Sequence, residues 1–286
     1  MPRTSDRLVA EGADRFRRPG ALERVAARLA RMRFAPGVRR SLRRAYELAL
    51  TVQTGGQGLA CTLPGGETVR VLPRYAGLTW NPDEYRAFRD AARPGMVALD
   101  VGANVGSYTM LLGRWAGPSG RVFSFEPAPR LFKGLSRHVR LNHLDATVTP
   151  VCSAVGARST MGRLLVAGTA GESRLAGASE GGDTMAVAVT SIDDFCAREG
   201  VRPDFIKIDV EGAELDVLRG ARRVIAERRG ALALFVEMHP SIWRAAGLTV
   251  ADLKDELRAQ RLEVEPLVPA ADPWAIEGVC LRLVAR

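Results

Sequence analysis

Several residue types and patterns that would mark other protein classes are scarce in this sequence of 286 residues. Its four cysteines are scattered and have neither metal-site nor disulfide spacing. The longest apolar run, near residues 231–236, is too short to span a bilayer. The amino terminus also lacks the apolar segment of a secretory signal. These absences predict a protein of the reducing cytoplasm, with peripheral contact to the inner face of the membrane left open.

Basic charge is abundant, but it is concentrated at one end of the chain. The net charge is +9, and residues 1–50 hold thirteen arginines against five acids, so this stretch carries +8 and the rest of the chain +1. No aromatic residues alternate with these arginines, so nucleic acid is not the expected partner. The charge belongs to a leader segment and not to the main domain.

Three regions follow from the patterning. Residues 1–53 form a basic extension with two expected amphipathic helices, over 20–34 and from about residue 38, separated at Pro36-Gly37. Residues 54–80 predict a β-hairpin cap that turns at Pro64-Gly65-Gly66. Residues 81–286 form the main domain. The extension is interpreted either as a cap on that domain or as an attachment to an anionic membrane or a lipid-linked substrate.

The main domain alternates strands and helices. Strands are expected over 96–101, 121–126, 146–155, 204–210 and 231–238, and helices over 82–92, 107–116, 129–142, 213–227 and near 249–260. Residues 156–190 are a long glycine-rich connection, and strands near 262–268 and 278–284 are too close for a helical crossover. The pattern predicts an α/β fold with a mostly parallel sheet and an antiparallel edge hairpin.

Polar side chains stand where the strands end, which is the edge where such sheets bind ligands. These residues are Asp100, Glu126, Ser153, Asp209 and Glu237. Charged side chains are costly to bury unless they are paired or used. We therefore expect a site for a polyhydroxylated or positively charged ligand at this edge.

The turn after the first strand, "LDVGANVGSYT", indicates which ligand. A dinucleotide fingerprint would need glycine at positions 104 and 107, which are Asn and Ser. Asp100 would also repel a pyrophosphate on the helix amino terminus, but it suits a ligand with an amino group. S-adenosylmethionine is such a ligand, and Glu126 ends the next strand, where an acid can accept hydrogen bonds from ribose hydroxyls.

The motifs "LDVGANVGSYT", "FSFEPAP", "IKIDVEGAELDVLRGA" and "LFVEMHP", in this order, resemble those of FkbM-type methyltransferases over roughly residues 80–240. The resemblance implies a class I (Rossmann-like) S-adenosylmethionine-binding fold and O-methylation of a sugar, glycolipid or polyketide-type hydroxyl. It implies that four residues surround the methionine end of the cofactor and that three others contact ribose, adenine and the region of the methyl group. The first four are Asp100, Gly102, Asn104 and Gly106; the others are Glu126 at ribose, Ser153 near adenine and Asp209, with Glu211, beside the methyl group.

Several side chains have alternative interpretations. Asn104 could cap the following helix, Lys207 is expected to pair with a neighbouring carboxylate, and Glu211 serves either the site or the amino terminus of the next helix. Glu214 is expected to be solvated, and His138 and His143 to lie on the surface.

His239 is the candidate general base, because a histidine titrates near neutral pH and follows Glu237 by two residues. The proposed catalytic set is thus Asp209, His239 and Glu211. Asp209, Glu237 and His239 also suit a divalent cation, although no metal is part of the main hypothesis.

The sequence therefore predicts an S-adenosylmethionine-dependent O-methyltransferase whose acceptor is a small molecule or a glycan- or lipid-linked hydroxyl. Two rival hypotheses remain. One is a non-catalytic membrane- or partner-binding protein on this scaffold, and the other is a nicotinamide-dependent oxidoreductase, against which the missing glycines argue.

Overall fold

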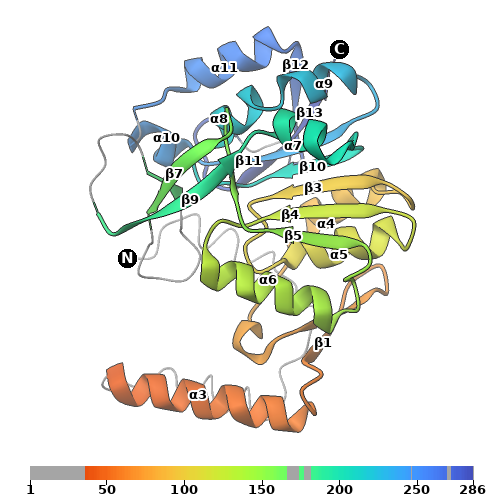
Figure 1. Cartoon of the computed structure of the whole chain (residues 1–286), viewed down its shortest axis with the longest axis vertical. Coiled ribbons are helices and arrows are strands. Elements are labelled where there is room, and N and C mark those ends of the chain that lie inside the picture. Colours follow the sequence, from red (N-terminus) through yellow and green to blue (C-terminus); the bar gives the residue numbers. More distant parts are fainter. Residues whose placement is uncertain (1–35, 166–173, 177–181, 246, 269–271, 286) are drawn as a thin grey trace.

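The computed structural model describes residues 36–165, 174–176, 182–245, 247–268 and 272–285. A seven-stranded sheet lies between two layers of helices (Figure 1). The strands, in order across the sheet, are β12 (Leu262–Pro266), β13 (Val279–Ala285), β11 (Ala233–Met238), β10 (Phe205–Ile208), β3 (Val97–Val101), β4 (Arg121–Phe125) and β5 (Val148–Val151). β11, β10, β3, β4 and β5 run parallel, and β13 and β12 form an antiparallel hairpin at one edge. This topology confirms the predicted fold class.

Alternate strand residues pack against opposite helical layers, as the pleat of a sheet requires. In β10, Phe205 faces the layer of α4 (Pro82–Ala91), α5 (Ser107–Ala116) and α6 (Pro129–Leu141). Ile206 and Ile208 face the other layer, formed by α7 (Ile192–Glu199), α8 (Glu214–Arg219), α9 (Arg222–Glu227) and α11 (Val250–Ala259). A short helix, α10 (Pro240–Ala245), follows β11.

The helix expected over 213–227 is two helices, because the chain turns at Gly220 and Ala221 between α8 and α9. A Cβ on Gly220 would lie 2.1 Å from the carbonyl oxygen of Gly156, so this close approach requires glycine.

The glycine-rich connection over 156–190 contains strands that the sequence analysis did not predict. A second, four-stranded sheet has the order β6 (Ala154–Val155), β9 (Thr184–Thr190), β7 (Thr160–Leu165) and β8 (Arg174–Leu175). Leu164, Val187 and Val189 are buried beneath it. The strand expected over 146–155 is therefore divided between two sheets, with Ser153 in the break between β5 and β6.

The segment before the main sheet packs on it through the α4–α5–α6 face. The expected hairpin is present as β1 (Leu59–Thr62) and β2 (Thr68–Val71), followed by the short helix η1 (Pro73–Tyr75). The second basic helix is α3 (Pro36–Gln53), whereas the helix predicted over 20–34 lies outside the described residues. Leu50 of α3 and Val69 and Val71 of β2 are buried in the same core as α5 and α6. No helix in the described ranges is both long and apolar enough to cross a membrane.

Candidate active site

The loop between β3 and α5 turns tightly, and three of its residues have positive φ. Gly102, Asn104 and Gly106 have φ values of 83°, 51° and 92°. A Cβ on Gly102 would lie 1.7 Å from the carbonyl oxygen of Asp209, so no side chain fits where this loop meets the end of β10. Asn104 does not cap α5, because the N-cap residue is Gly106 and no side chain caps it. The predicted turn is present, and the suggested capping role of Asn104 is wrong.

Asp100 points into the molecule beside this loop and is 1% exposed. Its Oδ2 accepts a hydrogen bond from the Thr109 hydroxyl at 2.5 Å, whereas Oδ1 has no hydrogen-bond partner among the described residues. Burial raises the pKa of Asp100, and the Lys207 charge opposes the shift. A buried oxygen without a partner is costly unless a ligand satisfies it.

Glu126 follows β4 directly and closes the other side of the loop. Its Oε2 accepts a hydrogen bond from the backbone N–H of Asn104 at 2.9 Å, and its Oε1 accepts one from the backbone N–H of Ala128 at 2.8 Å. Burial raises the pKa of Glu126 to about 7, although the two backbone hydrogen bonds lower it. The carboxyl group thus fixes the loop and presents an acceptor whose charge changes near neutral pH.

These loops line a cleft at the carboxyl ends of the strands, and its volume is about 590 Å³ when the part open to solvent is included. Its walls include six of the predicted site residues: Gly102, Asn104, Glu126, Ser153, Asp209 and Glu211. The second sheet contributes Leu164 and Leu175 to the cleft. A second cavity, of about 610 Å³ with its solvent-open part included, is lined by Asp100, Tyr108 and Lys207 and shares Gly102, Asn104 and Asp209 with the first. The two cavities therefore border the same loop from different sides.

The expected ion pair of Lys207 is present. Its Nζ donates a hydrogen bond to Asp209 Oδ2 at 3.0 Å, and the lysine side chain is only 4% exposed. Burial alone would lower the pKa of Lys207, but nearby carboxylates, Asp209 foremost, raise it above its usual value. Burial would raise the pKa of Asp209, but Lys207 and then His239 lower it overall. Both groups are therefore charged at neutral pH.

His239 lies at the end of β11 and is held by a residue that was expected to be solvated. Glu214 is fully buried, and its Oε1 lies 2.7 Å from His239 Nδ1 and accepts a hydrogen bond from the Gly212 N–H at 2.9 Å. Its Oε2 accepts a hydrogen bond from Trp243 Nε1 at 2.6 Å. Burial lowers the pKa of His239, but the hydrogen bond to Glu214 and nearby carboxylates raise it to about 10. His239 therefore carries two ring protons at neutral pH and is not poised to act as a free base.

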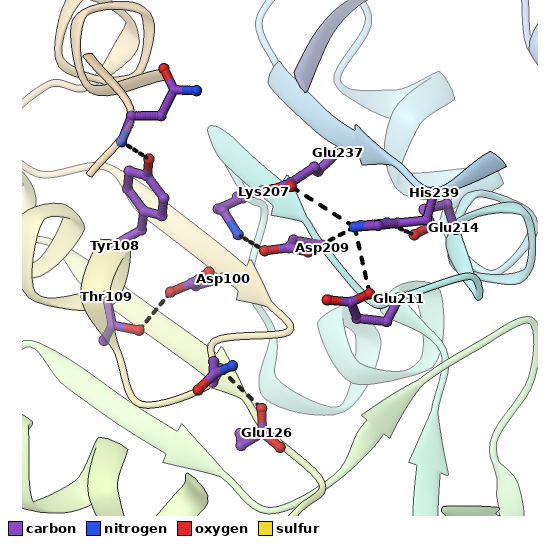
Figure 2. A network of polar contacts seen from close by, with 12 residues as sticks. Asp100, Tyr108, Thr109, Glu126, Lys207, Asp209, Glu211, Glu214, Glu237 and His239 are labelled. Atoms are coloured by element: carbon purple, nitrogen blue, oxygen red, sulfur yellow. Dashed lines mark hydrogen bonds and ion pairs between the residues drawn. The ribbon is translucent and has the colours of Figure 1, made fainter. Parts of the chain in front are cut away.

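The structure brings most of the predicted residues together. Asp209, Glu211, Glu237 and His239 meet at the ends of β10 and β11 (Figure 2). The ligand atoms of Asp209, Glu211 and His239 lie within 4.8 Å of one another, so Glu211 takes the place of Glu237 in the set that the sequence assigned to Asp209, Glu237 and His239. Gly106 stands outside both cavity linings and contacts α6, where a Cβ would meet Leu135 Cδ1 at 2.7 Å. Ser153 lines the cleft, but its hydroxyl donates to the backbone carbonyl oxygens of Ala154 and Ala188.

Two predictions about polar side chains are wrong. Glu214 is buried because α8 also buries Val217 and Leu218, three and four residues further on, which share its face. This spacing is a signal that could have placed it inside. His138 is fully buried instead of exposed, and its Nε2 accepts a hydrogen bond from the Leu72 N–H at 2.9 Å. Its Nδ1 therefore carries the proton and donates to the Val105 carbonyl at 2.6 Å.

One family model and several known proteins are similar to this chain. A model described as "Methyltransferase FkbM domain" matches residues 100–261, more than half of the chain. The hexuronic acid methyltransferase AglP of Haloferax volcanii is 26% identical over 200 residues, covering 70% of this chain and 77% of that protein. Methyltransferase 1 of Beauveria bassiana is 26% identical over 142 residues, covering 43% of this chain and 57% of that one.

Among solved structures, the crystal structure of methyltransferase FkbM from Methylobacillus flagellatus is similar, with a TM-score of 0.46 and 21% identity. The match covers 70% of this chain and 50% of that one, so the chain spans about half the length of this neighbour.

Proposed function

The chain belongs to the FkbM methyltransferase family, and from this premise we propose that it transfers the methyl group of S-adenosylmethionine to a hydroxyl of a sugar, glycolipid or polyketide-type acceptor. The observation that carries the proposal is the buried Oδ1 of Asp100, which has no hydrogen-bond partner in the described part of the chain. Asp100 lies on β3, which pairs with β4, and Glu126 follows β4 directly.

The residues present fit this cofactor. An ammonium group would satisfy Asp100 Oδ1, and the charge would offset the burial of the carboxylate. Glu126 has lone pairs left after its two backbone hydrogen bonds and can accept from both hydroxyls of a ribose. Gly102 leaves the loop bare of a side chain where the two cavities meet. Adenosine would thus occupy the 590 Å³ cleft and the amino acid portion the neighbouring cavity.

When bound, the sulfonium supplies an electrophilic methyl group. The residues of this chain would bind and align the two reactants, which can account for about 7–11 kcal/mol of barrier lowering. Asp209, which lines both cavities, would accept a hydrogen bond from an incoming hydroxyl. Asp209 is held ionised by Lys207, so it orients the hydroxyl more readily than it accepts a proton. Proton acceptance would add about 10²–10⁴-fold.

A sugar-type acceptor is supported by the chemistry of the site and by one relative. The site ends in carboxylates, which are hydrogen-bond acceptors suited to several neighbouring hydroxyls. The relative from Haloferax volcanii is named for a hexuronic acid, at 26% identity. The acceptor is therefore proposed as a sugar first and a polyketide hydroxyl second.

The test is calorimetric titration with S-adenosylhomocysteine and, in parallel, NAD, followed by a methyl-transfer assay on free uronic acids and glycolipids. We expect binding of the adenosyl compound, no binding of NAD, and loss of affinity in Asp100→Asn. Glu256→Gln is the matched control, since Glu256 is also a buried carboxylate but pairs with Arg222 outside the site. Binding of NAD alone, or unchanged affinity in Asp100→Asn, would overturn the proposal.

A further inference from the structure

Three carboxylates at the ends of β10 and β11 lie around Nε2 of His239 (Figure 2). Nε2 of His239 lies 3.9 Å from Asp209 Oδ1, 3.7 Å from Glu211 Oε2 and 3.8 Å from Glu237 Oε1. All three distances exceed a hydrogen bond. His239 is 6% exposed, and its Nε2 points toward three carboxylate oxygens that lie beyond hydrogen-bond distance.

The opposite side of the ring is fixed. Glu214 holds Nδ1, and Glu214 is itself held by Trp243 and by the Gly212 N–H. A histidine that ligates a metal almost always has its other nitrogen held by a carboxylate or carbonyl, which sets the ring orientation and the tautomer. The arrangement of Glu214 and His239 matches that pattern.

The distances and the charge also suit a cation. Ligand atoms bound at about 2.0–2.2 Å from a divalent ion are separated by about 3.0–3.5 Å when they are neighbours. The ligand atoms of Asp209, Glu211 and His239 lie within 4.8 Å of one another, so side-chain rotations that bring them closer would complete the set. Carboxyl groups outnumber basic side chains here: Lys207 and His239 face the carboxyl groups of Asp100, Asp209, Glu211, Glu214 and Glu237. Burial raises the pKa of Asp100 and of Glu237 and so favours their neutral forms, which leaves Asp209 and Glu211 as the charged ligands. Oxygen donors with one imidazole suit Mn²⁺, Mg²⁺ or Zn²⁺.

We propose that Asp209, Glu211 and His239 bind a divalent cation, which displaces the proton from Nε2 of His239, and that Glu214 is a positioning residue for His239. The role of this ion rests on the proposed function. It would coordinate the acceptor hydroxyl and lower its pKa. The hydroxyl loses its proton to solvent, its oxygen bonds to the methyl carbon, and the carbon–sulfur bond breaks, leaving a neutral thioether.

The test is a titration of the whole protein with Mn²⁺, in which binding is measured as the loss of the electron paramagnetic resonance signal of the free ion. We expect about one bound ion per chain and at least tenfold weaker binding in Glu211→Gln and His239→Ala. Glu214→Gln should weaken binding by about 10–100-fold, as loss of an outer-shell partner does. Glu211 is about one third exposed, so the isosteric Glu211→Gln keeps the fold even if His239→Ala does not. Glu227→Gln, at a surface acid on α9, is the control.

S-adenosylhomocysteine binding is measured on the same samples, so the two proposals can fail separately. Adenosyl binding without Mn²⁺ binding, or Mn²⁺ binding that is unchanged in Glu211→Gln and His239→Ala, would overturn the metal site alone. Mn²⁺ binding without adenosyl binding would overturn the proposed function and leave the metal site standing.

A second inference comes from α3, which lies apart from the sheet at one end of the molecule (Figure 1). Four of its apolar side chains share one side and are exposed: Val38, Leu42, Leu48 and Val52, at 48%, 39%, 64% and 73%. The helix is tied to the body by buried Leu50 on another side. Exposed apolar side chains gathered in this way mark an interaction surface.

Charge identifies the partner. Arg43 and Arg44 are exposed on the same helix, and residues 1–50 carry +8. An exposed apolar stripe beside arginines is typical of helices that lie on anionic bilayers. The geometry points to an anionic lipid surface as the partner of α3, with the apolar stripe in the headgroup region.

Vesicle flotation tests this assignment. We expect the protein to float with phosphatidylglycerol-containing vesicles, less with pure phosphatidylcholine, and at least tenfold less in Leu48→Glu/Val52→Glu. Met161→Glu is the matched control, at an exposed apolar residue on β7. The membrane assignment would be overturned if the protein does not float. It would also be overturned if light scattering shows a dimer for the wild type and a monomer for the α3 variant.

Discussion

The protonation state of Glu126 should make the affinity for the cofactor depend on pH. Burial raises the pKa of this carboxyl to about 7, so the free protein holds a proton there in acid and loses it above neutral pH. Only the ionised carboxylate can accept hydrogen bonds from both ribose hydroxyls while it keeps the bonds from Asn104 and Ala128. Affinity for S-adenosylhomocysteine should therefore rise with pH through about 7 and then level off.

The magnitude follows from the pKa. One unit below it, about a tenth of the molecules are ionised, so affinity at pH 6 should be about tenfold lower than at pH 8. Glu126→Gln removes the charge and cannot accept both backbone bonds. Hydrogen bonds to charged groups contribute about 1.5–3 kcal/mol, so the variant should bind at pH 8 about 10–150-fold more weakly.

Calorimetry at five pH values between 5.5 and 8 measures both effects. In wild type the affinity should follow a single titration near pH 7. Binding in acid should release a proton, so the measured binding heat there should change with the ionisation enthalpy of the buffer. Glu126→Gln should have a flat profile, and Glu256→Gln should keep the wild-type slope. A wild-type affinity that is constant over this range, or a slope that survives in Glu126→Gln, would refute the assignment of Glu126.

Three further substitutions test the framework around the site. Gly102→Ala should cost at least about 2 kcal/mol in urea unfolding, because its Cβ would meet the Asp209 carbonyl at positive φ. Gly200→Ala, at φ of 63° and ψ of 36° with open space around the Cβ, should cost only about 1 kcal/mol. Lys207→Met leaves Asp209 without its buried partner and should lower stability by about 3–5 kcal/mol, seen as a lower thermal midpoint. His138→Leu leaves a buried N–H and a carbonyl unpaired and should cost about 1–3 kcal/mol, and a loss below 0.5 kcal/mol would contradict the described contacts.

The sequence was sufficient for the parallel sheet, because each parallel strand is a short apolar run that ends at or beside a polar residue. β3 and β10 pair in register, with Lys207 beside Asp100, and this brings together two residues that the sequence singled out separately. Their meeting follows from strand ends sharing one edge of the sheet, which periodicity alone predicts.

Contacts between distant segments could not be predicted in the same way. His138 is buried because Leu72 and Val105, 66 and 33 residues away, supply its two hydrogen bonds. The second sheet was missed because β7 has mostly exposed side chains and a glycine at residue 162, which hides its alternation. The alternation of Val187 and Val189 in β9 was a usable signal for it.

The buried imidazole of His138 makes the hairpin and the ligand loop a single equilibrium. It joins the Leu72 N–H, just after β2, to the Val105 carbonyl, one residue beyond Asn104. Any opening of the hairpin must release the loop, and any ligand that orders the loop must hold the hairpin closed. The Leu72 amide should therefore exchange its hydrogen more slowly when the cleft is filled. A chain shortened to begin at residue 81 should bind the ligand of the cleft more weakly, although no residue of the hairpin lines the 590 Å³ cleft.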